Sequence, residues 1–280
     1  MPLFTLRILK LRLYNSIRNI LGGFMKRLFV FMISASLLLS FLSASASEAE
    51  NHFYIKRGVS HAPATTDPAF ESACGEKAFY RDVRAGETGE KRIYLTFDAG
   101  YENGNVAKIL DILKEENVPG AFFVLAHLVE ANTDLVKRMR NEGHLVCNHT
   151  AHHKNMAKLS LNDFCSEIRS LEEIYTEKTG EQLARFYRPP EGTFSFSNLE
   201  HANEMGYRTV FWSLAYCDWN DRVAPSKEKA MQILRDNTHP GAIVLLHPMS
   251  QINVDILREM IQYWRAEGYR LCSLEEVGGQ

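Results

Sequence analysis

The stretch Arg92–Gly104, which reads RIYLTFDAGYENG, indicates the fold of this chain. It begins as an apolar, β-branched and aromatic run, which is typical of a buried strand, and the run stops at a carboxylate. Two glycines follow, and residues 105–117 then show the apolar spacing of a helix. A strand that leads into a helix in an α/β protein points its carboxyl end toward the ligand crevice. Asp98 is therefore a candidate for chemistry, and capping of the next helix is the alternative.

The rest of the chain repeats this alternation of strand and helix. We expect further strands at residues 120–125, 144–148, 186–188, 208–214, 242–246 and 269–272. We expect further helices at residues 134–142, 160–179, 198–205, 226–237 and 252–267. This alternation implies a parallel sheet. Seven or so such units in fewer than 190 residues predict an α/β fold with a distorted, incomplete (β/α) barrel, since a full eightfold barrel typically takes about 250 residues.

Residues 1–46 have the pattern of a secretory signal peptide. Residues 1–47 hold six basic and no acidic residues, and they include the apolar run 28–42 and the small residues Ala44-Ser-Ala46. Met25-Lys-Arg27 makes a better start for such a peptide than Met1, so we expect residues 1–24 to be an over-long gene model. An uncleaved membrane anchor is the alternative, although the run is short for a span. We read residues 47–90 as an N-terminal extension that wraps the barrel of residues 91–280.

The composition argues against a nucleic-acid partner and a disulfide framework. The chain has 32 Lys+Arg and 34 Asp+Glu, so without the six basic residues of the leader the exported part carries a net charge of −8. Such a charge disfavours binding to nucleic acid. The five cysteines form no CxxC pair, and their number is odd. We expect an exported monomer that meets the membrane only through the leader, if the leader is not cleaved.

Ionisable side chains follow the predicted strands at the points where they end. These residues are Asp98, His149, Arg188, Asp218 and His247. In a parallel barrel these strand ends share one face, so the side chains should converge. His149 and His153 form an H-x3-H pair that, on a helical turn, would present both imidazoles to one metal ion. A histidine-rich polar loop is the alternative, because zinc usually takes a third protein ligand.

Two further motifs and one strand end supply candidate contacts for a ligand. The segment Arg188-Pro189-Pro-Glu191-Gly192 makes a rigid turn after a strand, where the arginine can orient a carboxylate. Asp218-Trp219 places an aromatic ring beside a carboxylate; an exposed ring suits stacking on a sugar, and ordinary core packing is the alternative. His247 ends a buried strand and is a candidate general acid, with a hydrogen-bonded core histidine as the alternative.

Taken in order, these motifs resemble those of the polysaccharide deacetylase family, the NodB-homology or carbohydrate esterase family 4 proteins. The motifs are Thr96-Phe-Asp98-Ala-Gly, His149-Thr-x-x-His153, Arg188-Pro-Pro-x-Gly192, Asp218-Trp219 and Leu245-Leu-His247. The resemblance spans residues 92–274 and implies a deacetylase domain over residues 91–280. Tyr101-Glu-Asn103-Gly, Val118-Pro-Gly-Ala-Phe-Phe-Val and the extension beginning near His61-Ala-Pro resemble the branch that makes muramic δ-lactam in spore-cortex peptidoglycan.

The resemblance implies a role for each candidate residue. Asp98 is the expected catalytic base and His247 the general acid, with Arg188 and Asp218 tuning and positioning them. The pair His149 and His153 is expected to bind a divalent metal ion, with zinc as the first candidate. The expected substrate contacts are Tyr101, Asn103, Pro189, Glu191, Trp219 and Leu246, the last of which would line the pocket for the acetyl methyl group.

Ala99 departs from the family pattern, in which a second aspartate follows the base and is the third metal ligand. A methyl group cannot ligate, so we expect the two histidines to hold the metal weakly. The implied reaction is hydrolysis of the N-acetyl group of N-acetylmuramic acid in a peptidoglycan glycan strand, in the cell wall or the forespore intermembrane space. The alternatives are a deacetylase of chitin or xylan, and a non-catalytic glycan-binding module whose metal site is lost.

Overall fold

The structure is a computed structural model that describes residues 49–73, 75, 77–220 and 222–278. The chain divides into two units, residues 1–47 and 48–280, and the fold described below is that of the second. The expected signal peptide of residues 1–46 and the alternative start at Met25 lie outside the described residues. Within the described part, no helix combines the length and the apolar character that crossing a bilayer requires.

The strands and helices alternate along the chain much as the sequence predicts. The strands are β1 (Asn51–His52), β2 (Ala78–Phe79), β3 (Arg92–Ala99), β4 (Ala121–Val124), β5 (Leu145–Asn148), β6 (Ala184–Tyr187), β7 (Thr193–Phe194), β8 (Arg208–Val210), β9 (Ala242–Leu246) and β10 (Arg270–Leu271). The α-helices are α2 (Pro68–Ala73), α3 (Val83–Thr88), α4 (Asn105–Glu115), α5 (Ala126–Ala131), α6 (Thr133–Asn141), α7 (Leu161–Thr179), α8 (Phe196–Glu204), α9 (Lys227–Asn237) and α10 (Gln251–Ala266). Short 3-10 turns are η1 (Met156–Lys158), η2 (Pro190–Gly192) and η3 (Leu274–Glu276).

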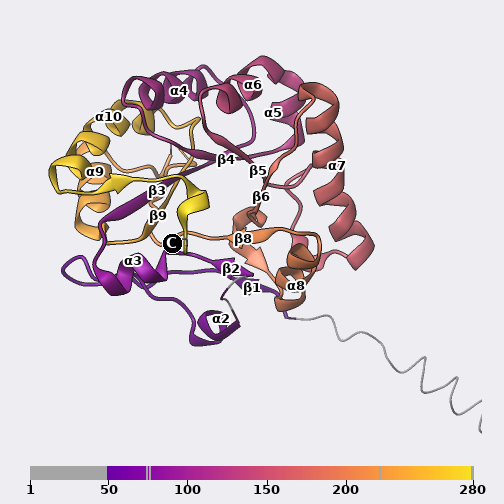
Figure 1. Cartoon of the computed structure of the whole chain (residues 1–280), viewed down its shortest axis with the longest axis horizontal. Helices are drawn as coiled ribbons and strands as arrows, with labels where there is room; N and C mark the ends of the chain where they lie inside the picture. Colours follow the sequence, from indigo (N-terminus) through magenta and orange to yellow (C-terminus); the bar gives the residue numbers. More distant parts are fainter. Residues whose placement is uncertain (1–48, 74, 76, 221, 279–280) are drawn as a thin grey trace, which may run out of the picture. The chain divides into compact units, whose positions relative to one another are not determined.

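A curled parallel sheet forms the centre of the molecule. Among the described residues it has eight strands, of which seven lie in the order β9, β3, β4, β5, β6, β8 and β2, while β10 also pairs with β3. A parallel bridge between Leu214 and Val244 joins the segment after β8 to β9, so the sheet curls toward closure. Helices surround the strands (Figure 1). These features confirm the predicted incomplete (β/α) barrel.

The side chains of β3 alternate between two apolar clusters. Leu95 and Phe97 belong to the large cluster that includes buried residues of α4, α9 and α10. Tyr94 belongs to a smaller cluster, which contains residues from β4, β5 and β9 but none from these three helices. Because side chains alternate across a strand, Thr96 and Asp98 share the face of Tyr94. Asp98 therefore lies at the carboxyl end of the inner row of β3.

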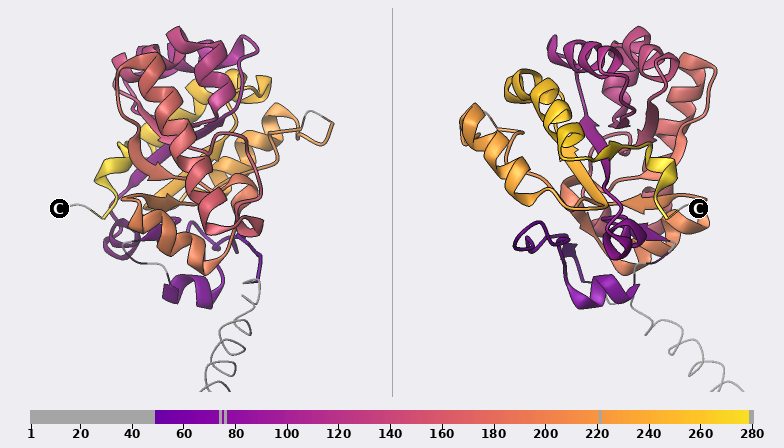
Figure 2. Two further views of the ribbon diagram at one scale, coloured as in Figure 1. Left: turned by 90° about the vertical axis from the view of Figure 1, so that its right-hand side faces the viewer. Right: turned by 60° about the vertical axis from the view of Figure 1, so that its left-hand side comes forward.

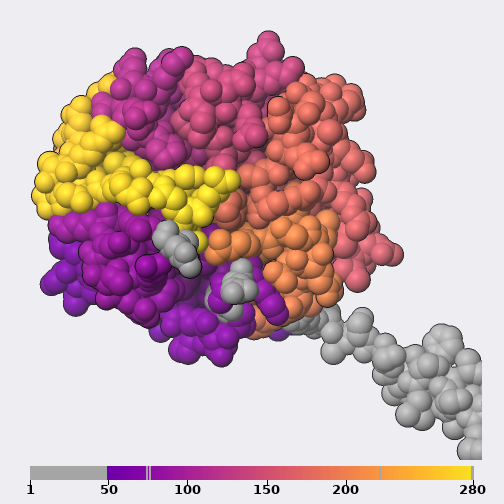
Figure 3. Space-filling model, in the orientation of Figure 1, coloured from indigo at the N-terminus to yellow at the C-terminus, as the bar shows by residue number. Residues whose placement is uncertain are grey.

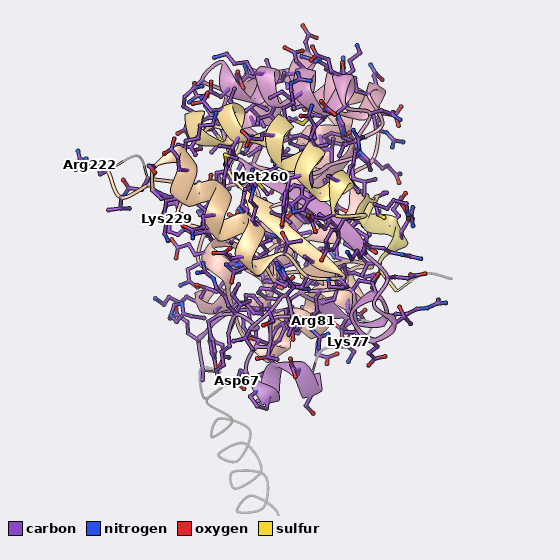
Figure 4. The ribbon with its side chains drawn as sticks, turned by 90° about the vertical axis from the view of Figure 1, so that its left-hand side faces the viewer. Asp67, Lys77, Arg81, Arg222, Lys229 and Met260 are labelled. Carbon is purple, nitrogen blue, oxygen red and sulfur yellow. The ribbon has the colours of Figure 1, made fainter. Side chains whose placement is uncertain are left out.

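The helices pack their apolar stripes on the sheet and on each other. Ser160 caps the start of helix α7, because its side chain accepts a hydrogen bond from Asp163 N, and Gly180, which has φ 79°, caps its end. Helices α9 and α10 lie side by side (Figure 4), with Met260 of α10 buried and Lys229 of α9 exposed. This periodic burial explains why the sequence predicted both helices.

Residues 49–90 pack against the barrel and contribute two short strands that pair with it (Figures 1 and 2). Strand β1 pairs antiparallel with β7, and β2 extends the parallel sheet next to β8. Phe53 and Phe70 pack with Phe194 and Phe211 in one aromatic cluster. At the other end of the chain, the C-terminal segment lies on the surface next to an early part of the chain (Figure 3), and Arg270 N of β10 donates to Lys91 O at 2.8 Å.

Candidate functional site

Arg188 holds Asp98 in a fixed position at the end of β3. Arg188 follows β6, is fully buried, and its Nη1 donates to Asp98 Oδ1 at 2.7 Å. Its other N–H groups donate to the carbonyls of Val210 and Phe211, at 3.0 and 3.2 Å, and to Thr96 Oγ1 at 2.9 Å. The guanidinium therefore binds groups on both sides of the barrel interior. Such multiple donation fixes a planar side chain in one orientation.

Asp98 is ionised at neutral pH. Burial acts to raise its pKa, but the charges of Arg188, His149 and His247 and the hydrogen bond from Arg188 hold that pKa below its ordinary value. Since Arg188 occupies Oδ1, the second oxygen, Oδ2, is the one that can accept a proton.

His149 and His153 come together next to Asp98. His149 Nδ1 forms a hydrogen bond with Arg188 O at 2.9 Å, and its Nε2 lies 3.6 Å from Asp98 Oδ2. The ring centres of the two histidines are 5.1 Å apart. The segment between them is a bend, not the helical turn that we expected, because Thr150 and His153 have φ values of 72° and 55°. The prediction of a helical turn was therefore wrong, but the two imidazole rings do lie next to each other.

The side chain of Glu167 in α7 stabilises this bend. The sequence patterns did not identify Glu167 as a site residue. It is 4% exposed and accepts hydrogen bonds from His152 N at 3.0 Å and from Lys154 Nζ at 2.7 Å. Its carboxylate also lies 3.0 Å from His152 Nδ1. Within the bend, Thr150 Oγ1 accepts from His153 N at 3.0 Å. No signal within the H-x3-H motif points to a glutamate 14 residues later.

The two histidines fit a divalent metal ion, with fewer protein ligands than zinc usually takes. Burial lowers the pKa of His149 to about 4, against the opposing charge of Asp98, so its imidazole is neutral, as a metal ligand must be. Because Nδ1 of His149 forms a hydrogen bond with Arg188 O, Nε2 of the same ring is left to bind a metal ion. This arrangement is common in metal sites. Within the described residues, no three His, Cys, Asp or Glu side chains form a metal-binding group.

Asp218 orients His247, the residue that follows β9. Asp218 is 2% exposed; its Oδ2 accepts from His247 N at 2.7 Å and its Oδ1 pairs with His247 Nδ1 at 2.7 Å. Burial acts to lower the pKa of His247, but the hydrogen bond and charge of Asp218 and the charge of Asp98 raise it above its ordinary value. Since Nδ1 is bound to Asp218, Nε2 is the nitrogen left to meet a ligand.

Two residues that sequence patterns missed extend the hydrogen bonds of this pair, Asn253 directly and Tyr216 through Asn253. Asn253 Nδ2 donates to Asp218 Oδ2 at 2.6 Å, and the hydroxyl of Tyr216 donates to Asn253 Oδ1 at 2.5 Å. Asn253 lies in the first turn of α10, six residues after His247. This spacing matches no motif, so only the fold reveals the contact.

Two predicted substrate contacts are exposed aromatic rings. Trp219 is 65% exposed and its ring centre lies 5.8 Å from that of His247, whereas Tyr101 is 50% exposed. Arg222 lies on a loop that projects outward beside α9 (Figure 4). Asn103 instead ties two loops together, because its Nδ2 donates to Met249 O at 3.0 Å. Contact of these residues with a substrate stays a prediction.

The remaining predicted contacts lie on the turn after β6 and at the end of β9. Pro189 is buried, and Glu191 is exposed with φ 58°, a backbone conformation that costs energy for a residue with a side chain. Gly192 cannot be replaced easily, since a Cβ there would lie 2.8 Å from the Trp212 ring. Leu246 is 1% exposed and belongs to the large apolar cluster. Its place in an acetyl pocket also stays a prediction.

Comparisons with known proteins agree with this geometry. A family model described as "Polysaccharide deacetylase" matches residues 85–210. The chain is 38% identical over 247 residues to the peptidoglycan-N-acetylmuramic acid deacetylase PdaA of Bacillus subtilis, which covers 87% of this chain and 92% of that protein. It is 33% identical over 202 residues to a peptidoglycan-N-acetylglucosamine deacetylase of Bacillus cereus, covering 71% of this chain and 72% of that one.

A solved structure gives the same assignment. The structure of Bacillus subtilis PdaA, described as a family 4 carbohydrate esterase, matches with a TM-score of 0.77 at 37% identity, over 82% of this chain and 97% of that one. The parallel barrel, the ordered polar residues at its strand ends and these likenesses lead to one conclusion. This chain belongs to the polysaccharide deacetylase family, whose members are hydrolases.

Proposed function

We propose that this protein removes the N-acetyl group from N-acetylmuramic acid in the glycan strands of peptidoglycan. The observation that carries the proposal is the pairing, in one site, of an ionised carboxylate, Asp98, with a histidine of raised pKa, His247. The likeness to a muramic acid deacetylase supports this sugar, since it extends over 92% of that relative, against 72% for the glucosamine deacetylase. A deacetylase of another polysaccharide, such as chitin or xylan, is the alternative.

Asp98 and His247 move the protons in the proposed reaction. Water adds to the amide carbonyl, the C–N bond breaks, and the products are acetate and a free amine. Asp98 takes a proton from the attacking water at Oδ2, because Arg188 occupies Oδ1. His247 gives a proton from Nε2 to the leaving nitrogen, while Asp218 stabilises the charged imidazolium at Nδ1. Each proton-transfer group typically contributes about 10²–10⁴-fold in rate.

Other residues would stabilise the negative charge that develops on the former carbonyl oxygen. A backbone N–H of the turn around Glu191 is the proposed hydrogen-bond donor to this oxygen. His149 and His153 would hold a divalent metal ion, with zinc as the first candidate. When bound, such an ion polarises the carbonyl and lowers the pKa of a bound water.

We further propose that the freed amine then closes onto the lactyl carboxyl of the same sugar, which forms muramic δ-lactam. This ring closure requires a lactyl group that carries no stem peptide, because the peptide otherwise occupies the carboxyl. The proposed location is outside the cytoplasmic membrane, in the cell wall or, in a spore-forming cell, the forespore intermembrane space. The signal-peptide pattern and the peptidoglycan-acting relatives support this location.

Mass spectrometry of digested peptidoglycan tests the proposal. Purified protein is incubated with glycan strands whose stem peptides an amidase has removed, and with intact strands as the comparison. We expect muramic acid to lose acetyl in the stripped strands and a part of it to lose water as well. Loss of acetyl from glucosamine would assign the protein to a different substrate. Loss from neither sugar, with chitin and xylan oligosaccharides also unchanged, would favour a glycan-binding module without activity.

A further inference from the structure

A chain of hydrogen bonds leads from the interior of the protein to His247. Tyr216 is 5% exposed, and its hydroxyl donates to Asn253 Oδ1 at 2.5 Å. Asn253 is fully buried, and its Nδ2 donates both to Asp218 Oδ2 at 2.6 Å and to His247 O at 2.9 Å. Asp218 in turn binds the backbone N–H and the ring Nδ1 of His247. The loop after β8, the end of β9 and the first turn of α10 thus form one network.

Tyr216 determines which way the Asn253 amide faces. The oxygen and nitrogen of an asparagine side chain have nearly the same shape, so its partners decide its orientation. Burial and the charge of Asp218 raise the pKa of Tyr216 well above its ordinary value, so its hydroxyl remains a donor. With this donor on Oδ1, Nδ2 faces Asp218. The reverse orientation would place Oδ1 against the carboxylate and leave the hydroxyl without an acceptor, which is costly in a buried site.

The network also sets which oxygen of Asp218 is available to the ring. Oδ2 accepts from His247 N and from Asn253 Nδ2, so Oδ1 is left for His247 Nδ1. We infer that Asn253 and Tyr216 are positioning residues for His247. They fix the orientation of Asp218, so that the neutral imidazole of His247 keeps its proton on Nδ1 and directs Nε2 toward the substrate. The inference rests on the proposed function, in which His247 is the proton donor.

Kinetics of two single variants and their combination test the inference. We expect Tyr216→Phe to lower kcat for acetate release about threefold to tenfold, which is typical of one lost hydrogen bond. Asn253→Ala should lower kcat about 10- to 100-fold, because a misplaced proton donor is costly. KM should stay unchanged in both, since neither residue is assigned to the substrate. The double variant should be no slower than Asn253→Ala, because the tyrosine acts through the asparagine.

Two further variants keep this test decisive. Tyr94 is also fully buried, and its hydroxyl donates to Asp82 Oδ2 at 2.6 Å, so Tyr94→Phe removes a comparable bond away from the site. It should leave kcat unchanged. Asn253→Asp preserves the side-chain size and replaces Asn253→Ala if that variant does not fold; it should lose at least as much kcat. An effect confined to KM, single losses that multiply in the double variant, or an equal loss in Tyr94→Phe would each overturn the inference.

Nitrogen NMR of isotope-labelled histidine gives a readout that needs no turnover. The His247 signals are assigned by their disappearance in His247→Gln. In the wild type we expect the neutral ring to carry its proton on Nδ1, and in Asn253→Ala we expect a mixture of both tautomers. An unchanged tautomer in this variant would overturn the inference. A tautomer change in a protein that deacetylates no glycan would support the positioning role and refute the proposed reaction.

Discussion

Asp98 has two oxygens with different tasks. Arg188 binds Oδ1 at 2.7 Å and fixes the carboxylate, while Oδ2 lies 3.6 Å from His149 Nε2 and remains able to accept a proton. The pairing also matters for the fold, because the fully buried Arg188 needs a negative partner. Replacement of Asp98 by a neutral residue of the same size therefore removes the proton acceptor but keeps the packing, whereas a shorter side chain would remove both.

We predict that Asp98→Asn lowers kcat about a hundredfold or more, because an amide cannot take the proton from water. The side chain keeps its size and can still accept a bond from Arg188, so circular dichroism should show an intact fold. Asp111→Asn is the matched control, since Asp111 also pairs with an arginine, Arg138, but on the exposed side of α4. Acetate release is the measurement for both. Wild-type turnover in Asp98→Asn would show that another group is the base.

Ala99 offers a second test at the scale of one residue. It is fully buried, so a carboxylate at this position would be unfavourable unless a cation neutralises it. We predict that Ala99→Asp lowers the melting temperature in the presence of a chelator and that added zinc raises it by more than in the wild type, since ligand binding stabilises the folded state. Turnover can still fall, because the carboxylate would replace a methyl group that packs in the large apolar cluster.

The control for this prediction is Ala99→Asn, which has the same shape as the aspartate without its charge. Its melting temperature should respond to zinc no more than that of the wild type. Thermal unfolding with and without zinc is the measurement for all three proteins. If zinc shifts Ala99→Asp and Ala99→Asn equally, position 99 does not face the metal.

At the scale of elements, α7 shapes the bend between the two histidines that we propose as metal ligands, His149 and His153. Thr150 and His153 have positive φ values, which cost about 1–3 kcal/mol each unless the surroundings compensate. Glu167 provides compensation through its side chain, and its carbonyl accepts a hydrogen bond from Ala151 N at 3.1 Å. One residue of α7 thus holds the bend by both backbone and side chain.

We predict that Glu167→Ala weakens the binding of zinc about 10- to 100-fold, which is the range for residues that orient metal ligands. Titration calorimetry of chelator-treated protein measures the affinity. Glu173→Ala, an exposed glutamate on the same helix, is the control and should bind zinc as the wild type does. Equal zinc affinity in Glu167→Ala and the control would mean that the bend keeps its shape without α7.

The position of the site residues was predictable from sequence, and the shape of the loops was not. Asp98 and His247 each follow an apolar run, so their convergence follows from the geometry of a parallel barrel. Glu167 and Asn253 act on the site from helices, through contacts that no local spacing encodes. The positive φ of His153 is likewise set by such contacts, which explains why the expected helical turn was wrong.

The same limit applies to the short strands of the fold. β2 has two residues, Ala78 and Phe79, which is too few to show a period of two. It pairs with β8, whose partner residues are about 130 positions later in the chain. The predicted strand of residues 208–214 is regular only to Val210, because the chain then turns to bridge β9 through Leu214.

At the scale of the whole molecule, two strands have a histidine near each of their ends. His149 and His247 follow β5 and β9 at the end of the barrel where the site lies, whereas His144 and His239 precede the same strands. Both His144 and His239 are at most 2% exposed, and each has a buried Nε2 for which the described part of the chain offers no hydrogen-bond partner. Burial lowers the pKa of each to about 4. These two rings are therefore built into the fold in the neutral form.

The sign of the resulting pH dependence follows from linkage. The folded-state pKa of each histidine, about 4, lies below the ordinary value of 6.5. Between these pH values the imidazole is protonated in the unfolded chain but stays neutral in the native protein. The free energy of unfolding is therefore unaffected above the unfolded pKa and decreases as pH falls toward about 4. Protonation of His144 at Nδ1 would also break the hydrogen bond that Gly120 N donates to this atom at 3.2 Å.

We predict that His144→Asn and His239→Asn each reduce the loss of unfolding free energy between about pH 7 and about pH 4.5 by roughly 2 kcal/mol, since a 1-unit pKa difference is worth about 1.4 kcal/mol. Asparagine suits both sites, because its oxygen can accept from Gly120 N and its nitrogen can donate to Pro240 O. Urea unfolding at the two pH values is the measurement. His127→Asn, at an exposed position, should leave the pH dependence unchanged. An acid-induced loss as large in both variants as in the wild type would mean that other groups cause it.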